Sequence, residues 1–184
     1  MLAQGSRRTQ ADDYNRPVEE LRFLCDVMLG RLARWLRLAG FDTLYDAAAA
    51  DANLATTARA EGRWLLTRDR RLASGAGPRV VLVRAVSLAD QLAEVGERLP
   101  LAAAANRSFS RCPRCNGLLK AAARETVSRR VPPYVAAHAP EFRLCQDCGQ
   151  VYWPGTHVPR IERRLAAILG GGGPLGGGED EGHR

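Results

Sequence analysis

The chain has 184 residues, of which 46% are apolar, so it can build one α/β domain and a small appended unit but not two large domains. All but one of its 27 basic residues are arginines, and the formal net charge is +7. This favours an anionic partner such as nucleic acid, unless the chain simply prefers arginine to lysine. No apolar run reaches 18 residues and the first 20 residues are polar, so the sequence predicts neither a membrane span nor a secretory signal.

Strands alternate with helices in the first 100 residues. Short apolar runs predict strands at 21–25, 41–45, 63–67 and 79–83, and periodic apolar spacing predicts helices at 28–39, 51–61 and 88–99. Strands joined by helices of this length are typical of β-α-β units, in which the strands run parallel. The predicted fold is therefore α/β with a parallel sheet over residues 21–100, after a flexible arm at residues 1–20.

Two C-x-x-C pairs appear after this region, Cys112 with Cys115 and Cys145 with Cys148. Four thiolates are the tetrahedral set that structural zinc prefers, so we predict a zinc ribbon over residues 108–168. Two disulfides or a redox couple are the alternative. Gly117 and Gly149 follow the pairs, where positive φ angles would let backbone N–H groups point at sulfur.

The chain outside these two units has little capacity to fold. Half of residues 169–184 are glycine, and this segment is predicted to be a disordered tail. Paired C-x-x-C motifs without a secretory signal favour metal ligands over disulfides, and a reducing cytoplasm as the location.

Three aspartates lie where predicted elements change. Asp26 closes the first strand, Asp69 follows the third, and Asp51 begins the second helix. Because ligands of open parallel sheets bind at the carboxyl ends of the strands, we expect these side chains to share a pocket. Clustered carboxylates hold Mg²⁺ or Mn²⁺, and such an ion activates water for attack on a phosphodiester. Each aspartate taken alone has a structural alternative, namely capping the helix that follows it.

Longer segments around these residues resemble the Mut-seven C-terminal RNase domain family. The resemblance covers roughly residues 21–168 and is carried by the spaced cysteine pairs and by FLCDVMLGRLARWLRLAGFDT at 23–43, LLTRDR at 65–70 and VYWPGTH at 151–157. It implies a PIN-like three-layer α/β nuclease domain with a parallel sheet, followed by a small zinc ribbon with four cysteine ligands. Asp26, Asp51 and Asp69 match acids that hold the catalytic ion in the family. The family's fourth acid has only Asp90 as a loose counterpart.

The resulting hypothesis is a metal-dependent ribonuclease that hydrolyses RNA phosphodiester bonds. Mg²⁺ or Mn²⁺ would be catalytic and Zn²⁺ structural, and Arg34, Arg37 and Arg68 are the first candidates for contacts to substrate phosphates. The main alternative is a non-catalytic module that binds RNA, a ribosome or another ribonucleoprotein through its zinc ribbon. In that case the aspartates would only be caps. A toxin-like nuclease held by a partner protein is a third hypothesis.

Overall fold

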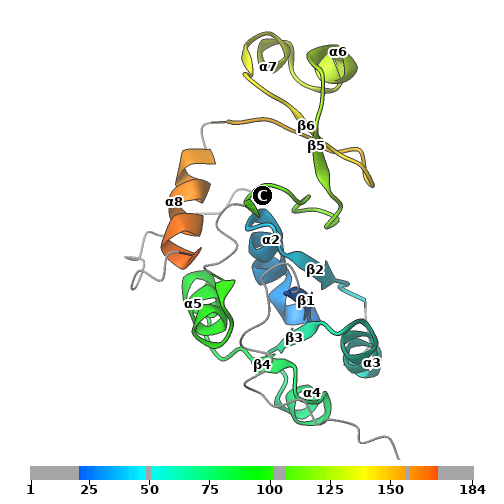
Figure 1. Cartoon of the computed structure of the whole chain (residues 1–184), viewed down its shortest axis with the longest axis vertical. Coiled ribbons are helices and arrows are strands. Elements are labelled where there is room, and N and C mark those ends of the chain that lie inside the picture. Colours follow the sequence, from blue (N-terminus) through cyan, green and yellow to red (C-terminus); the bar gives the residue numbers. More distant parts are fainter. Residues whose placement is uncertain (1–20, 49–50, 102–106, 156–157, 170–184) are drawn as a thin grey trace, which may run out of the picture.

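The structure is a computed structural model that describes residues 21–48, 51–101, 107–155 and 158–169 (Figure 1). The predicted arm at residues 1–20, the alanine run at residues 102–105 and the tail at residues 170–184 lie outside the described residues. Among the helices that are described, none combines the length and apolar character that a membrane span needs.

A parallel sheet forms the centre of the first part of the chain, as predicted. Its strands are β1 (Arg22–Cys25), β2 (Asp42–Tyr45), β3 (Trp64–Thr67) and β4 (Val80–Leu82). They lie in the order β2-β1-β3-β4, and every neighbouring pair is parallel. The connecting helices are η2 (Val27–Leu29, a 3-10 turn), α2 (Gly30–Leu38), α3 (Asp51–Glu61), α4 (Arg70–Gly75) and α5 (Leu88–Arg98).

The sheet is covered by helices on both faces, because its short strands are apolar on both sides. Phe23 and Cys25 pack with residues of α2 and α5, whereas Leu24 between them packs with residues of α3 and α4. Leu66 and Leu65 divide between the two faces in the same way. Successive residues of a strand point to opposite faces, so each strand contributes to two cores. The predicted three-layer α/β architecture is confirmed (Figure 1).

The strand order creates a switch point between β1 and β3. The chain moves outward from β1 to β2 and then returns to place β3 on the other side of β1. In doubly wound sheets the loops after the two strands at such a point diverge, and they leave a crevice at the carboxyl ends of the strands. Asp26 directly follows β1, and Asp69 lies two residues after the end of β3.

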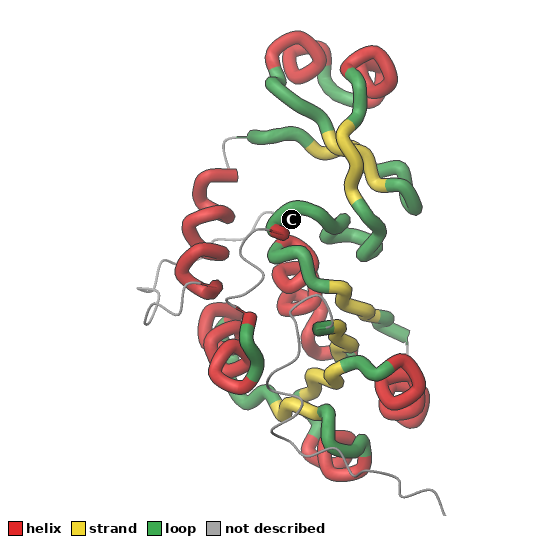
Figure 2. The backbone as a smooth tube through the Cα atoms, viewed as in Figure 1, coloured by secondary structure: helices red, strands yellow, loops and turns green. Residues whose placement is uncertain are grey.

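A small antiparallel sheet with its own core forms the second part (Figure 2). It consists of β5 (Leu119–Ala121), β6 (Arg143–Cys145) and β7 (Val151–Tyr152), in the order β5-β6-β7. Between the cysteine pairs lie α6 (Arg124–Val127), η4 (Ser128–Arg130) and α7 (Pro133–His138). Val127, Phe142 and Val151 are buried together in this unit. The antiparallel sheet and the cysteine cluster are consistent with the predicted zinc ribbon.

The last helix, α8 (Val158–Leu169), returns to the first part of the molecule and lies beside α5 (Figure 1). Leu165 is 2% exposed and belongs to the core under α2 and α5, and Arg164 lies over the Trp35 ring at 5.7 Å from its centroid. This segment lies within the range predicted for the ribbon, whereas its apolar face is buried against the α/β layers. The helices before and after the ribbon, α5 and α8, therefore both pack in the α/β part.

Candidate active site and metal centre

The Asp26 carboxylate is held rigidly at the carboxyl edge of the sheet. The backbone N–H of Asp26 donates to Leu66 O at 3.0 Å, which extends the pairing of β1 with β3 by one residue. Oδ1 accepts a hydrogen bond from the Met28 N–H at 2.9 Å, and Oδ2 accepts bonds from Thr67 Oγ1 at 2.5 Å and from the Arg68 N–H at 2.7 Å. Asp26 is only 3% exposed. Its position is therefore fixed by the fold.

Asp26 is buried but has no cationic partner within the described residues. Its three donors are two peptide N–H groups and a hydroxyl, and within the described residues it forms no ion pair. A buried carboxylate without a counter-charge is costly, since hydrogen bonds replace only part of its hydration. A carboxylate has about four acceptor positions, so Oδ1 retains one for a further ligand. The site therefore fits a bound cation on chemical grounds.

Thr67 is a site residue that sequence reasoning missed. It is fully buried, and besides its bond to Asp26 its Oγ1 accepts a hydrogen bond from the Asp69 N–H at 2.9 Å. One hydroxyl thus connects the two acidic positions. The signal that could have found it is a polar residue at the end of an otherwise apolar strand, two positions before an acid.

Asp69 is exposed and caps α4, the alternative role that the sequence offered for this residue. Its Oδ1 accepts hydrogen bonds from the Arg71 N–H at 2.6 Å and the Leu72 N–H at 3.0 Å. Asp26 caps the short η2 turn in the same manner. Capping uses only one oxygen of Asp69, and within the described residues Oδ2 makes no hydrogen bond. A capping role thus leaves this carboxylate able to take a second ligand.

The third predicted acid, Asp51, is the first residue of α3, the helix that follows β2. Its side chain lies outside what the structure describes, so only its place in the chain is established. The structure brings Asp26 and Asp69 to adjacent strands and joins them through Thr67, but it assigns no position to the Asp51 carboxylate. Asp90 is part of the cap of α5, where its Oδ2 accepts from Ser87 Oγ at 2.7 Å.

The three predicted phosphate-binding arginines have different surroundings. Arg34 is exposed on α2, and Arg68 is half-buried directly after β3. Arg37 is 5% exposed, and its guanidinium donates to the carbonyl oxygens of Thr43, Pro113 and Arg114. These carbonyls occupy Arg37 at the boundary between the α/β part and the ribbon, so we retain only the other two as candidates for RNA contact.

Cys25 lies at the end of β1, next to Asp26, but is fully buried. Burial raises the pKa of its thiol far above the ordinary range, and the neighbouring Asp26 raises it further. The thiol therefore keeps its proton at neutral pH. A protonated buried thiol is a poor nucleophile, so Cys25 is a core residue.

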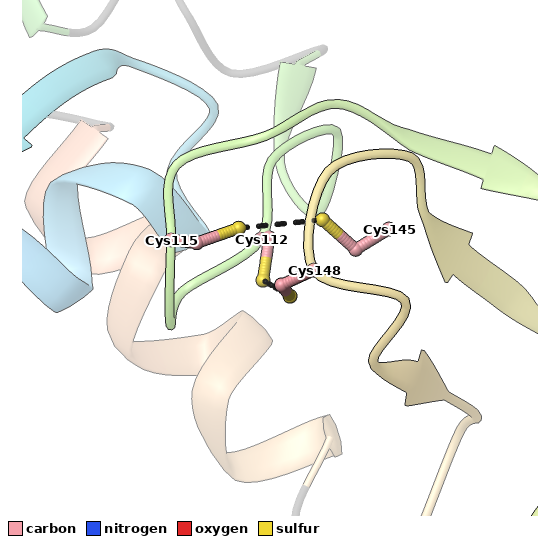
Figure 3. Close-up of side chains that lie close together, drawn as sticks. All are labelled: Cys112, Cys115, Cys145 and Cys148. Carbon is pink, nitrogen blue, oxygen red and sulfur yellow. Dashed lines mark hydrogen bonds between the residues drawn. The ribbon is translucent and has the colours of Figure 1, made fainter.

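The four cysteines of the ribbon converge on one point (Figure 3). All four Sγ atoms lie within 4.8 Å of one another, with Cys112 and Cys148 3.7 Å apart and Cys115 and Cys145 3.4 Å apart. Tetrahedral zinc with Zn–S bonds of about 2.3 Å requires sulfur atoms about 3.8 Å apart. The donor set and spacing therefore fit zinc. Within the described residues no other group of three or more Cys, His, Asp or Glu side chains is close enough to hold an ion.

The backbone of the two cysteine knuckles differs in one detail from the prediction. Gly149 has a positive φ of 71°, as expected, but in the first knuckle the positive φ of 75° belongs to Asn116. Gly117 is needed for a different reason, since a Cβ there would lie 2.5 Å from Asp147 Oδ2 and 2.9 Å from the Cys145 Sγ. The tight turn is present as predicted, but its residue with positive φ is Asn116, one position before the predicted Gly117.

Tyr152 supports the sulfur cluster from β7. Its hydroxyl lies 3.0 Å from Cys112 Sγ. Burial raises the pKa of the phenol, and the hydrogen bond with Cys112 adds to this effect, so the hydroxyl keeps its proton. A protonated phenol donates to a thiolate, the form in which cysteine binds zinc, and such donors orient metal ligands.

Comparison with known proteins identifies the family. No curated protein and no solved structure matches the chain. The model of the Mut7-C RNAse domain matches residues 21–165, which include the parallel sheet, both acidic positions of the switch point and all four cysteines of the ribbon cluster. This family implies a ribonuclease with RNA as its substrate. With the fold and the match in agreement over most of its length, the chain belongs to the Mut7-C RNase domain family.

Proposed function

We propose that this chain is a metal-dependent ribonuclease whose active site lies at the switch point between β1 and β3. Asp26, Asp69 and Asp51 would hold Mg²⁺ or Mn²⁺. The observation that supports this proposal best is the burial of the Asp26 carboxylate without any cationic partner in the described residues. A cation bound there would supply the missing counter-charge.

The chain's own residues prepare this site for hydrolysis. Such an ion, when bound, lowers the pKa of a coordinated water and stabilises charge on a phosphoryl oxygen. Thr67 and two backbone N–H groups hold the Asp26 carboxylate in one orientation, so it needs no rearrangement. Arg34 and Arg68 are our candidates for binding the phosphates that flank the cleaved bond. Free water as the nucleophile predicts that no covalent intermediate forms.

The helix-capping bonds of Asp26 and Asp69 favour a second, non-catalytic function. Because Asp26 and Asp69 both cap the helices that follow them, they also suit a non-catalytic module that binds RNA or a ribonucleoprotein. Both functions suit a reducing compartment such as the cytoplasm, since the four ribbon thiols must stay reduced to bind zinc.

Cleavage of labelled single-stranded RNA with Mn²⁺, Mg²⁺ or EDTA tests the proposal. The sharpest variant is Asp69→Asn, because the amide oxygen preserves both capping bonds made by Oδ1 and only the other oxygen changes. We expect cleavage that requires added Mn²⁺ or Mg²⁺ and that falls at least about 100-fold in Asp69→Asn, the scale for losing a group that stabilises the transition state.

Glu125→Gln is the matched control, since it makes the same carboxylate-to-amide change at an exposed acid in the first turn of α6, in the ribbon. It should cleave like the wild type. If the wild type does not cleave RNA with either ion but still binds it, the non-catalytic function replaces the proposal. If Asp69→Asn cleaves as fast as the wild type and Glu125→Gln, the activity belongs to another site.

A further inference from the structure

Strand β2 is an edge strand, yet its outer backbone groups are not left to solvent. The Thr43 N–H donates to Asn116 Oδ1 at 2.9 Å, and the Thr43 carbonyl accepts from Arg37 Nε at 2.8 Å. Thr43 is fully buried. Exposed edge groups can pair with other chains, and proteins commonly cover them. Here the cover is provided by one side chain of α2 and one of the first cysteine knuckle.

Asn116 connects the knuckle to two consecutive residues of β2. Besides accepting from Thr43, it donates from Nδ2 to Asp42 Oδ1 at 2.8 Å, and it is only 8% exposed. It directly follows Cys115, and its own N–H donates to Cys112 O at 2.9 Å inside the knuckle. The position of the Asn116 amide is therefore set by the same short loop that sets the positions of two sulfur atoms.

The second knuckle shows that asparagine is not required for the turn itself. Gly149 follows Cys148 as Asn116 follows Cys115, and the two have nearly the same φ, 71° and 75°. Glycine reaches this conformation without steric cost, whereas asparagine adopts it less readily. In the first knuckle the asparagine adds what glycine lacks, namely an amide that reaches the edge of β2.

Arg37 ties the same loop to the same strand from the other side. Its Nη1 donates to the carbonyl oxygens of Pro113 at 3.3 Å and Arg114 at 3.0 Å, the two residues between Cys112 and Cys115. These contacts use backbone atoms, so they depend on the shape of the loop and not on its side chains. That shape is the one in which the two thiols converge.

We propose that the zinc-bound first knuckle is a clamp that positions β2, with Asn116 as its positioning residue. Zinc would fold the loop from Cys112 to Cys115, the loop would hold Asn116 and the carbonyls for Arg37, and these would fix Thr43. Loss of zinc would then loosen β2 although the metal lies in the other unit. The consequence for cleavage rests on the proposed function, since β2 leads to α3 and Asp51.

Amide hydrogen exchange measured by NMR on the full chain tests the clamp. Removing zinc with a chelator should raise the exchange rate of the Thr43 amide about 5- to 150-fold, the scale of losing two ordinary hydrogen bonds. The Leu65 amide, which donates to Arg79 O between β3 and β4, should keep its protection. Metal analysis verifies that zinc has been removed.

Asn116→Gly should reproduce this local loosening with zinc still bound, because glycine keeps the positive φ and removes only the amide. Coupling between two sites is reciprocal, so the variant should also bind zinc more weakly by a similar factor in chelator competition. Arg114→Ala is the matched control. It removes an exposed side chain from the same loop and preserves the carbonyl that Arg37 uses, so it should behave like the wild type.

Two results would overturn the clamp. One is an unchanged Thr43 exchange rate after complete zinc removal, and the other is an equal loss of protection at Thr43 and Leu65. Both results are exchange rates of the wild type, so the test does not depend on whether a variant folds. Cleavage measured on the zinc-free samples after the chelator is removed and Mg²⁺ is restored should fall as Thr43 loosens. A wild type without any cleavage would refute the proposed function, whereas the exchange rates would still decide the clamp.

Discussion

Asp26 follows the carboxyl end of β1, and Asp42 lies at the amino end of the neighbouring strand β2. Both carboxylates are largely inaccessible, but they differ in whether an arginine side chain pairs with them. Asp42 begins β2 and lies 2.8 Å from Arg63 Nη1 and 3.7 Å from Arg111 Nη2. Burial alone would raise the pKa of Asp42, but hydrogen bonds from Arg63 and Asn116 and the nearby arginine charges lower it below the ordinary value. Asp26, after β1, has three neutral donors and no ion pair with an arginine side chain among the described residues.

The difference indicates how a structural carboxylate can be told from a candidate ligand. Two acids at the ends of neighbouring strands look alike in the sequence, and in the structure Asp26 is buried and Asp42 is half-buried. At the amino ends of the strands, Asp42 is paired with arginines of the chain itself, Arg63 and Arg111. Because Arg111 and Asn116 belong to the first cysteine knuckle region, Asp42 also helps to connect the sheet to the ribbon. The carboxyl edge leaves its acid without a counter-charge in the described residues, so a cation from solution has a reason to bind there.

Arg63→Ala should give the largest loss of stability at the amino edge. The Arg63 side chain is buried and contacts Asp42, Glu61 Oε2 at 2.7 Å and Phe23 O at 3.3 Å. Removing one partner of a buried pair leaves the other unpaired, so we expect a loss of about 3–5 kcal/mol in the free energy of unfolding measured with urea. Arg71→Ala, an exposed control, should change it by about 0.5 kcal/mol or less. Equal losses of stability in Arg63→Ala and Arg71→Ala would show that the ion pair between Arg63 and Asp42 does not stabilise the fold.

Mn²⁺ should stabilise the wild type and Asp42→Asn but not Asp26→Asn. A ligand at about 100 times its Kd adds about 2.7 kcal/mol to the free energy of unfolding, and only the carboxyl edge is expected to bind the ion. Thermal unfolding with and without Mn²⁺, at saturating zinc, measures the difference for each protein. Stabilisation of Asp26→Asn equal to that of the wild type would place the ion elsewhere.

Thr67→Val should cost about 1–3 kcal/mol of stability without added metal. The replacement preserves shape, but it deprives Asp26 Oδ2 of a donor and the Asp69 N–H of its acceptor. Urea unfolding of Thr67→Val beside Thr67→Ser measures this cost, since serine keeps the hydroxyl. If valine is tolerated better than serine, the hydroxyl bridge does not organise the acidic edge.

The smallest expected effect is a pH dependence of the free energy of unfolding that arises from Asp42. Because its pKa is lower in the folded than in the unfolded chain, its contribution to stability is present above the unfolded pKa of about 3.9 and is lost as the pH falls through the folded pKa. The stability difference between the wild type and Asp42→Asn should therefore narrow below about pH 4 in urea titrations. A difference that stays constant from pH 7 to pH 3 would mean that the Asp42 charge contributes nothing.

Local sequence predicted much of the fold, because its signals act over a few residues. Four short apolar runs gave the four strands to within about one residue at each end, and the helix predicted at 88–99 is observed as α5. The start of the helix predicted at 28–39 differs, since Asp26 holds a 3-10 turn over Val27–Leu29 before α2 begins. The four cysteines converge as their spacing predicted, since each C-x-x-C already brings two thiols together.

Other features depend on residues that are distant in sequence, and no local pattern specifies them. The segment 158–169 is amphipathic by itself, but only the tertiary structure decides that its apolar face is buried under α5 and not in the ribbon. Arg37 follows Arg31 and Arg34 at helical spacing, but burial against the first knuckle is what separates it from its exposed neighbours. Asp26 and Asp42 carry the same charge in the sequence, and the three-dimensional arrangement alone determined which of them would have an arginine beside it.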